Sequence, residues 1–405
     1  MAEQRGQAAL IWALGATQVI GYGTEYYSFS ILADDAAQSF AQSRSWFFLI
    51  VSLALIAGGM VMPFAGRLFD RFGAARLMVL GSALGALSLA CTALSMAIWP
   101  FIIAMCAVQI VSSLVLYDAA FTSIVQSGIG ASQNRIMALT LIAGFASSVF
   151  WPLTTALDHA FGWRATLLIY AAMNLLFCVP VHAWVAKAGG RAKPRDAAPE
   201  AANATAEQPS LGGAMSLRLM VLITAGFSLT GVTLSAILSQ MVPLLQALGL
   251  GGMALVVSTL FGPAQVAMRA VNLFFGAGRN PLAVTLFSLT LLPLALFLLA
   301  LTAPYVAGAV VFAVLVGLSS GLKSVVQGTL PLAVFGRAGY GARLGIMSGV
   351  RYVLAALAPF GFAWSSEAIG PRGASALFAA IGVIGVVCFL EVARLARVGA
   401  FRLNA

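Results

Sequence analysis

Charged side chains are scarce in this sequence. Asp, Glu, Lys and Arg make up only 8% of its 405 residues, whereas 61% of the residues are hydrophobic. A soluble domain needs far more charged residues to cover its surface. A membrane-spanning helix needs about 20 apolar residues, so the chain is long enough for roughly a dozen of them. We therefore predict an all-α polytopic membrane protein.

Cysteine and histidine are also rare. The four cysteines lie far apart in apolar runs, which argues against a disulfide framework, a metal site or a bound cofactor. His159 and His182 fall at the ends of predicted spans, where interfacial positions are expected. A membrane-embedded enzyme would need a His/Asp or serine-based group near one interface, so an enzyme is not expected. A receptor or scaffold would need a soluble signalling module, which is also missing.

Acidic residues number 12, against 22 basic ones. The cations are not clustered in the way that nucleic-acid binding requires, so no nucleic-acid partner is expected. They follow the positive-inside rule instead. With the N-terminus inside, the outer loops hold only Arg44, Arg164 and Arg372. This pattern predicts a multi-pass protein of a bacterial-type inner membrane, with both termini cytoplasmic, and we expect a monomer in the lipid bilayer.

Hydropathy predicts twelve membrane-spanning helices. They cover residues 8–32, 46–65, 77–97, 99–124, 136–157, 165–185, 219–245, 252–275, 282–303, 305–334, 344–367 and 373–393. The connection 186–217 is rich in Ala, Gly, Pro and charge and is expected to be a flexible cytoplasmic linker. It divides the chain into two six-helix bundles, residues 1–185 and 218–405.

The two halves share a weak internal repeat. Gly162 and Arg164 recur 208 residues later as Gly370 and Arg372. Together with the central linker, this repeat predicts two pseudo-symmetric halves, an arrangement typical of secondary transporters.

The loop between the second and third predicted spans carries a motif. Its residues match G-x-L-x-D-R-x-G-x-x-R and are Gly66, Leu68, Asp70, Arg71, Gly73 and Arg76. The motif resembles the loop that joins helices two and three in the major facilitator superfamily of transporters. The resemblance implies a twelve-helix fold of two pseudo-symmetric six-helix bundles and transport by alternating access.

The same resemblance assigns this loop to the inner gate. The residues with a gating role would be Gly66, Asp70, Arg71, Gly73 and Arg76. In the family the acid faces a helix N-terminus, expected here near residues 341–344, where the helix dipole favours a negative charge. The sequence FGWR at 161–164 resembles the outer turn before helix six. Two other features are missing: Cys106 stands where an arginine is usual, and helix five lacks the G-P-x-x-G-G run of drug/proton antiporters.

Five charged residues stand out inside predicted spans. They are Glu25, Asp118, Arg269, Lys323 and Arg351. A charge at the centre of a membrane costs about 2.5–3.5 kcal/mol on insertion scales, so such residues usually face a cavity or a partner. Three cations against two acids leave the interior positive, which favours an anionic substrate.

The first half of the chain supplies the two acids. Gln18, Tyr22 and Glu25 lie on one side of a 3.6-residue helix, which we interpret as a cavity wall with a protonatable acid. The alternative is a glutamate near the outer interface that only supports helix packing. Asp118 is the second candidate, because a carboxyl in apolar surroundings can bind and release a proton near neutral pH. Its alternative role is a structural salt bridge.

Arg269 shares a helix face with Gln265 and Asn272 in the run FGPAQVAMRAVN. This run resembles helix eight of the monocarboxylate and oxalate transporters, in which an arginine contacts the substrate carboxylate. A guanidinium offers paired donors to a carboxylate and stays charged. The alternative is an intramembrane ion pair with Asp118 or Glu25.

Two further cations lie in predicted helices ten and eleven. Lys323 has Ser319 one turn before it and Gln327 one turn after it, and Arg351 lies deep in its helix. Each is expected either to contact the anion or to pair with an acid.

These observations predict a secondary active transporter. It would move a small, monocarboxylate-like organic anion by alternating access, coupled to protons. The predicted substrate-binding residues are Tyr22, Gln265, Arg269, Lys323, Gln327 and Arg351, and the predicted proton-coupling residues are Glu25 and Asp118. The alternative is an exporter of drugs, metalloid or siderophore-like compounds, in which the interior cations would form salt bridges with the two acids.

Overall fold

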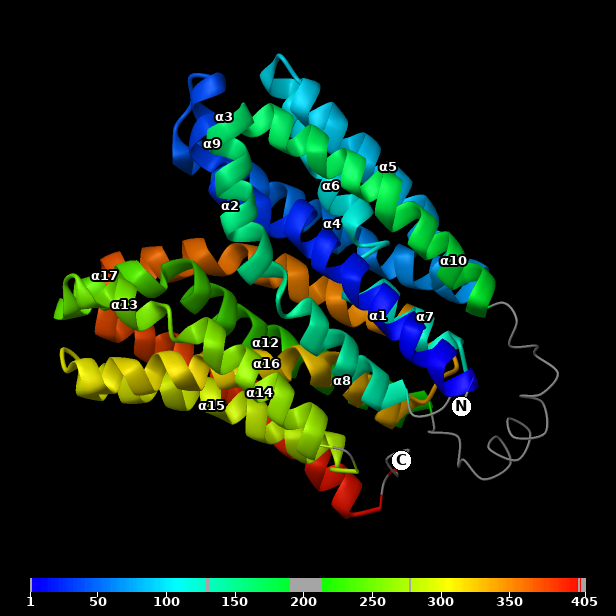
Figure 1. The fold of residues 1–405 in the computed structure, drawn as a ribbon. Helices are drawn as coiled ribbons and strands as arrows, with labels where there is room; N and C mark the ends of the chain where they lie inside the picture. Colours follow the sequence, from blue (N-terminus) through cyan, green and yellow to red (C-terminus); the bar gives the residue numbers. More distant parts are fainter. Residues whose placement is uncertain (1, 129–131, 190–212, 277, 400, 402–405) are drawn as a thin grey trace. The chain divides into compact units, whose positions relative to one another are not determined.

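The computed structural model describes residues 2–128, 132–189, 213–276, 278–399 and 401, and every regular element among them is helical. The chain divides into two compact units. The N-terminal unit contains the described residues up to Leu211 together with Arg337–Gly349. The C-terminal unit contains those of Gly212–Gly336 and Val350–Ala405. Figure 1 shows the helices of both.

The helices of the N-terminal unit include two single π-helical turns, η1 and η2. In chain order they are α1 (Ala2–Tyr22), η1 (Gly23–Tyr27), α2 (Ser28–Ile31), α3 (Ala33–Ser39), α4 (Arg44–Phe72), α5 (Ala74–Leu94), α6 (Ile98–Ser112), α7 (Tyr117–Gln126), α8 (Ser132–Ala143), α9 (Ala146–Met173), η2 (Asn174–Cys178) and α10 (Val179–Gly189). The unit is completed by the start of α17. A core of aromatic and aliphatic side chains, including Phe47, Phe101 and Tyr170, holds these helices together.

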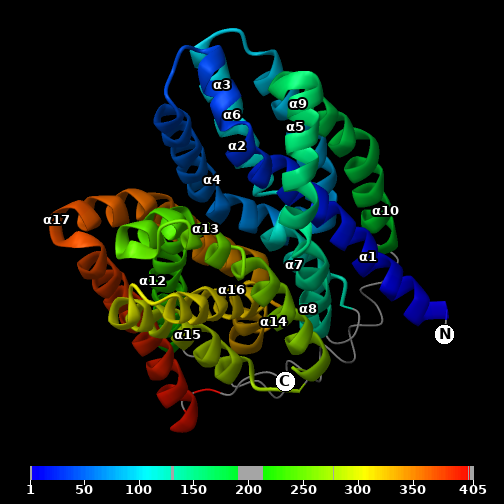
Figure 2. The same cartoon turned by 60° about the vertical axis from the view of Figure 1, so that its left-hand side comes forward.

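The C-terminal unit is built around α16. Its helices are α12 (Gly213–Leu245), η3 (Gln246–Leu250), α13 (Met253–Ser258), α14 (Phe261–Phe275), α15 (Pro281–Thr302), α16 (Val306–Phe335) and α17 (Tyr340–Arg397, from Val350 onward). The helix α16 packs against both α14 and α15 (Figure 2). Gly317 and Gly321 let α16 approach the α14 backbone closely, since a methyl group on either would lie 2.5 Å from an α14 carbonyl oxygen.

Nine helical stretches of the described residues are long and apolar enough to span a membrane. Two of them, Ser132–Ala188 and Tyr340–Arg397, are 57 and 58 residues long, more than twice what one crossing needs. Both are interrupted at a glycine, Gly162 (φ 79°, ψ 165°) and Gly370 (φ 77°, ψ 164°). The predicted connections between spans five and six, and eleven and twelve, fall at these breaks. The count of twelve spans remains a prediction.

The two glycine breaks have matching partners. Arg164 donates from Nη1 to the carbonyls of Ala93 and Ser95, both at 2.7 Å, at the end of α5. Arg372 donates from Nη2 to the carbonyl of Ala303 at 2.9 Å, at the end of α15. Only glycine adopts this backbone conformation readily, and the free carbonyls at a helix end need donors. The predicted internal repeat therefore corresponds to the same local structure in both units.

Three of the predicted spans are interrupted by short breaks between helices. The span 99–124 is broken at residues 113–116 between α6 and α7, and the span 136–157 is broken at 144–145. The span 252–275 is broken between α13 and α14, where Pro263 in the first turn of α14 has no N–H and excludes the carbonyl four residues before it. Hydropathy does not register such breaks, because the residues on either side stay apolar.

The predicted linker 186–217 lies mostly outside the described residues. Its two ends, however, are helical, because α10 continues to Gly189 and α12 begins at Gly213. The division of the sequence into 1–185 and 218–405 remains a prediction.

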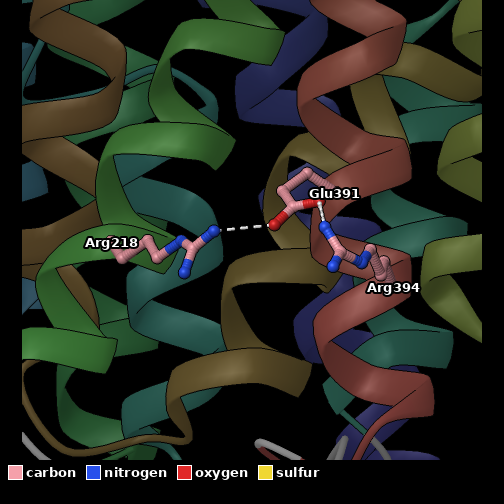
Figure 3. A network of polar contacts seen from close by, with 3 residues as sticks. All are labelled: Arg218, Glu391 and Arg394. Carbon is pink, nitrogen blue, oxygen red and sulfur yellow. Dashed lines mark hydrogen bonds and ion pairs between the residues drawn. The ribbon is translucent and has the colours of Figure 1, made fainter.

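Within the C-terminal unit, Glu391 of α17 accepts from Arg218 of α12 at 2.7 Å and from Arg394 at 3.3 Å (Figure 3). These ion pairs are solvent-exposed and are worth about 1 kcal/mol or less each.

Candidate functional site

The acid of the charged loop faces a helix N-terminus. Asp70 Oδ1 accepts a hydrogen bond from the Gly341 N–H at 3.0 Å, and Asp70 Oδ2 accepts one from the Ala342 N–H at 2.8 Å. Both amides belong to the first turn of α17 and have no acceptor within the helix. The carboxylate therefore caps α17 from another helix, at the position that the sequence led us to expect. Its gating role remains a prediction.

The glycines of this loop serve two different purposes. A methyl group on Gly66 would collide with the Gly341 carbonyl, and one on Gly345 would lie 3.0 Å from the Gly66 Cα atom, so α4 and α17 touch through their backbones. Gly73, by contrast, has open space around it but a φ of 87°. It is required for the turn between α4 and α5 rather than for packing.

Sequence reasoning missed Gln126, which secures the same turn. Its side-chain Nε2 donates to the Phe69 carbonyl at 2.8 Å, and its Oε1 accepts from the Ala74 N–H at 2.8 Å. One amide thus satisfies both the C-terminal end of α4 and the N-terminal end of α5.

The two arginines predicted for the gate, Arg71 and Arg76, are exposed, and Arg71 lies over the Phe72 ring at 5.0 Å.

The predicted wall of Gln18, Tyr22 and Glu25 is not a single surface. Gln18 donates to the Val115 carbonyl at 2.7 Å, which is freed by the break between α6 and α7. Tyr22 packs against the Tyr117 ring at 4.7 Å between centroids. Glu25 is turned instead toward α5, because the π-helical turn η1 interrupts the 3.6-residue period between Tyr22 and Glu25.

Glu25 is completely buried in the N-terminal unit. Neither carboxylate oxygen has a hydrogen-bond partner among the described residues. A methyl group on Gly85 of α5 would lie 2.6 Å from Glu25 Oε1, so the missing side chain at Gly85 makes the room for the carboxylate. The main chain is held separately, since Gln109 Nε2 donates to the Glu25 carbonyl at 2.7 Å. The role of Glu25, whether in proton coupling or, as in the alternative, in helix packing near the outer interface, remains a prediction.

Asp118 occupies a different environment. It is 5% exposed and lies in the first turn of α7, where the helix dipole favours a negative group. Ser348 of α17 donates to Asp118 Oδ1 at 2.7 Å. The structure therefore gives this carboxyl a hydroxyl partner within its own unit and does not bring it together with Glu25 in any described contact.

A cluster of partly exposed aromatic rings borders helix one, and sequence reasoning recognised only part of it. Its members are Tyr22, Tyr26, Tyr27, Tyr117 and Trp151, drawn from α1, η1, α7 and α9. Neighbouring ring centroids lie between 4.7 and 6.2 Å apart. The sequence YGTEYY in helix one indicates the first three of these aromatic residues. It does not indicate their partners from other helices, Tyr117 and Trp151.

The interfacial position expected for His182 is wrong. Its side chain is fully buried, with Nδ1 2.7 Å from Ser82 Oγ and Nε2 2.9 Å from Thr17 Oγ1. Thr17 donates its own proton to the Leu14 carbonyl at 2.9 Å. His182 must therefore donate from Nε2 and accept at Nδ1, and it fastens α10 to both α1 and α5.

In the C-terminal unit, two of the predicted cations converge. A methyl group on Gly231 of α12 would lie 3.3 Å from Arg351 Cγ and 3.5 Å from Lys323 Nζ. Lys323 is 4% exposed, and Arg351 lies with its guanidinium 5.0 Å from the Tyr352 ring centroid. Gly231 leaves the space into which both side chains extend. The structure thus brings α12, α16 and α17 together around two like charges.

Arg269 is buried in α14, with 6% of its surface exposed. One turn before it, Gln265 Nε2 donates to Ser320 Oγ of α16 at 2.7 Å. Gln265 therefore supports helix packing as well as lying on the Arg269 face. Gln327 on α16 is half-buried. No contact that the structure describes joins Arg269 or Gln327 to the pair of Lys323 and Arg351.

Acidic residues are few in this half of the chain. From residue 212 onward the sequence has only Glu367 and Glu391. Glu367 is exposed, and Glu391 pairs with Arg218 and Arg394 at the far ends of α12 and α17. Among the described contacts, neither of these two acids is paired with Lys323.

Together, apolar helices of membrane-spanning length and charged side chains buried between them define a polytopic membrane protein of the carrier type. The chain belongs to the major facilitator superfamily of transporters, whose family model matches residues 14–359. No curated protein sequence matches the chain.

Several solved structures share the fold. The human organic anion transporter MFSD10 (TETRAN) superposes with a TM-score of 0.70 at 14% identity, covering 94% of this chain and 98% of that one. The proton:xylose symporter XylE gives 0.71 at 13% identity, covering 95% and 96%. The fucose transporter FucP in its outward conformation gives 0.65 at 14% identity, covering 94% and 97%. At these identities the similarity concerns the fold alone.

Proposed function

We propose that this protein is a secondary active transporter for a small organic anion, monocarboxylate-like in chemistry, that works by alternating access and is coupled to protons. Its place would be the inner membrane, with both termini in the cytoplasm, as the distribution of Lys and Arg predicts. The anion-binding residues would come from the C-terminal unit, and the proton-binding residue from the N-terminal unit.

The observation that carries the anion proposal is the convergence of Lys323 and Arg351 over Gly231. A buried ammonium without a counter-charge is costly, and a second cation beside it adds repulsion. A bound carboxylate would relieve both costs, because it can accept from the ammonium and from the guanidinium together. Neither Glu367 nor Glu391 is placed to do this.

Glu25 is the proposed proton carrier. In a site that offers it no cation and no donor, a carboxyl group is accommodated at least cost as the neutral acid. Release of the proton then requires a conformational change that brings water or a positive group to the carboxylate. Such a dependence of protonation on conformation is what proton coupling needs. Asp118, which has the Ser348 hydroxyl as a partner, is the second choice.

Two of the similar structures belong to proteins whose described functions resemble the one proposed here. One is described as an organic anion transporter and another as a proton symporter. Their resemblance lends support to anion transport and to proton coupling as chemistries of the fold. It says nothing about which residues of this chain perform them.

The test is binding by Lys323→Gln and Lys323→Arg variants. The probes are a panel of monocarboxylates from acetate to benzoate, measured with purified protein. Loss of a charged hydrogen bond should weaken binding of the best ligand by about 10- to 150-fold in Lys323→Gln, with partial recovery in Lys323→Arg. Arg279→Gln removes an exposed cation of the same unit and is the control. Wild-type affinity in Lys323→Gln would contradict the proposal.

The rival function is export of drugs or similar compounds, and the aromatic cluster of Tyr22, Tyr26, Tyr27, Tyr117 and Trp151 favours it. Aromatic faces attract organic cations with about 0.5–2 kcal/mol each. In that case Tyr22→Ala would abolish binding of cationic compounds, whereas Lys323→Gln would leave it unchanged. The opposite pattern supports the anion carrier.

A further inference from the structure

A groove of about 820 Å³ lies between α5 and α10 of the N-terminal unit. The two helices pack side by side (Figure 1). The residues that line the groove are Arg76, Val79, Ala183, Trp184, Ala186, Lys187 and Ala188. Three of them are alanines, so the α10 side of the groove has little to fill it. Neither the proposed anion site nor the charged loop's contact with α17 uses this space.

The two helices that form the groove are joined by the buried His182, which precedes the lining residue Ala183. Its hydrogen bonds to Ser82 of α5 and Thr17 of α1 connect three helices. Met78 of α5 and Val185 of α10, close to these residues in the sequence, are 0% and 2% exposed. The spacing of α5 and α10 is therefore fixed by interior contacts, and the groove is a built feature of the unit.

Two cations stand at the rim, Arg76 in the first turn of α5 and Lys187 in the last turn of α10. None of the lining residues is acidic. Within the described part of the chain, neither cation takes part in an ion pair. Both lie five or six residues beyond the His182–Ser82 bond, which at about 1.5 Å per residue is roughly 8–9 Å further toward the helix ends. A ligand with negative charge is the chemistry that complements this rim.

Below the rim the surface becomes apolar and exposed. On α5, Leu80, Leu84 and Leu87 are 51%, 36% and 60% exposed, and on η2 Leu176 is 74% exposed. In a membrane protein such side chains face the lipid acyl chains. Trp184 is 45% exposed between the two zones, where tryptophan commonly marks the headgroup level of the bilayer. The groove is thus continuous with the lipid-facing surface of the same two helices.

We propose that this groove binds an anionic phospholipid, with the phosphate between Arg76 and Lys187 and the acyl chains over the leucines of α5. The positive-inside pattern assigns this end of the helices to the cytoplasmic leaflet. Basic pockets between membrane helices on that side bind anionic headgroups. The acyl chains distinguish a lipid from free phosphate, which would meet the same two cations but gain nothing from the apolar surface.

The experiment compares lipid retention by full-length wild-type protein and two variants, using phosphatidylglycerol and phosphatidylethanolamine of equal chain length and detection by native mass spectrometry. Wild type should retain phosphatidylglycerol in preference. Lys187→Gln should weaken this retention about five-fold, the effect expected for one cation at an anionic surface. Arg279→Gln removes an exposed cation outside the groove and should have no effect. Trp184→Leu should weaken retention of both lipids while the protein stays folded.

Three results would overturn the proposal. The first is equal retention of the two lipids by wild type. The second is an equal loss in Lys187→Gln and Arg279→Gln, which would show a general charge effect. The third is displacement of the lipid by inorganic phosphate, which would identify a phosphate site without lipid specificity.

Discussion

Replacement of Gly85 by alanine tests the role of Glu25 without changing any charge. The added methyl group would lie 2.6 Å from Glu25 Oε1, and its next neighbour is Val111 Cγ1 at 3.9 Å. To restore even a 3.0 Å separation, the carboxylate must move by about 0.4 Å or more. Since only the end of a flexible side chain is in the way, the helices need not move.

The effect on stability and the effect on coupling should differ. Alanine is favoured over glycine inside a helix by about 0.8–1.0 kcal/mol, which offsets part of the crowding. Crowding of the carboxylate itself costs about 1–3 kcal/mol. It destabilises the conformation in which the Glu25 carboxylate packs against α5. We therefore expect a melting temperature near that of wild type. Uptake driven by a pH gradient should fall by about 5- to 150-fold.

The assay uses proteoliposomes and the carboxylate that stabilises the purified protein most. Gradient-driven uptake is compared with counterflow, which requires no net proton movement and should persist in Gly85→Ala. Glu25→Gln should show the same pattern. Gly262→Ala is the matched control, because a methyl group there meets no atom within 4 Å. The reasoning fails if Gly85→Ala keeps wild-type gradient-driven uptake, or if it loses counterflow to the same extent.

Substitutions at three further positions give distinct outcomes. Asp70→Asn weakens two hydrogen bonds to the start of α17, at a cost of about 1–2 kcal/mol, and should slow transport while ligand affinity measured by calorimetry stays within two-fold or so of wild type. Gln126→Leu leaves the Ala74 N–H without its acceptor and removes one of two donors from the Phe69 carbonyl, which still accepts from the Gly73 N–H, and should destabilise the protein by about 1–3 kcal/mol, seen as a lower melting temperature in detergent. Arg269→Ala and Arg269→Lys should both abolish carboxylate binding in a folded protein, and full uptake by either would exclude Arg269 from the anion site.

Features governed by local rules were accessible from the sequence. Gly162 and Gly370 could be paired because a left-handed turn between two helices accepts almost nothing but glycine, and each is followed two residues later by an arginine that caps a helix end. Asp70 could be placed because an acid in a short loop gains most at a helix N-terminus. In both cases the local backbone determines which residue type is favoured.

Features that depend on distant partners were not accessible. The break at residues 113–116 is stabilised by Gln18, which lies 97 residues before Val115. The π-helical turn at Gly23–Tyr27 directs Glu25 away from the wall that was predicted with Gln18 and Tyr22. The periodicity of the sequence does not predict this turn. His182 was misplaced because its position near a span end says nothing about the bonds that it makes with Thr17 and Ser82. In each case the deciding contact joins residues whose proximity only the fold creates.

A ligand-stabilisation screen of the purified wild-type protein tests anion transport most directly. The compounds are monocarboxylates, phosphates and cationic drugs, each measured at several pH values, with the Lys323→Gln variant run in parallel. The convergence of the buried Lys323 and the partly exposed Arg351 in the C-terminal unit predicts a higher melting temperature with carboxylates, and no such rise in Lys323→Gln. Stabilisation by cationic compounds alone, equal in wild type and Lys323→Gln, would contradict it.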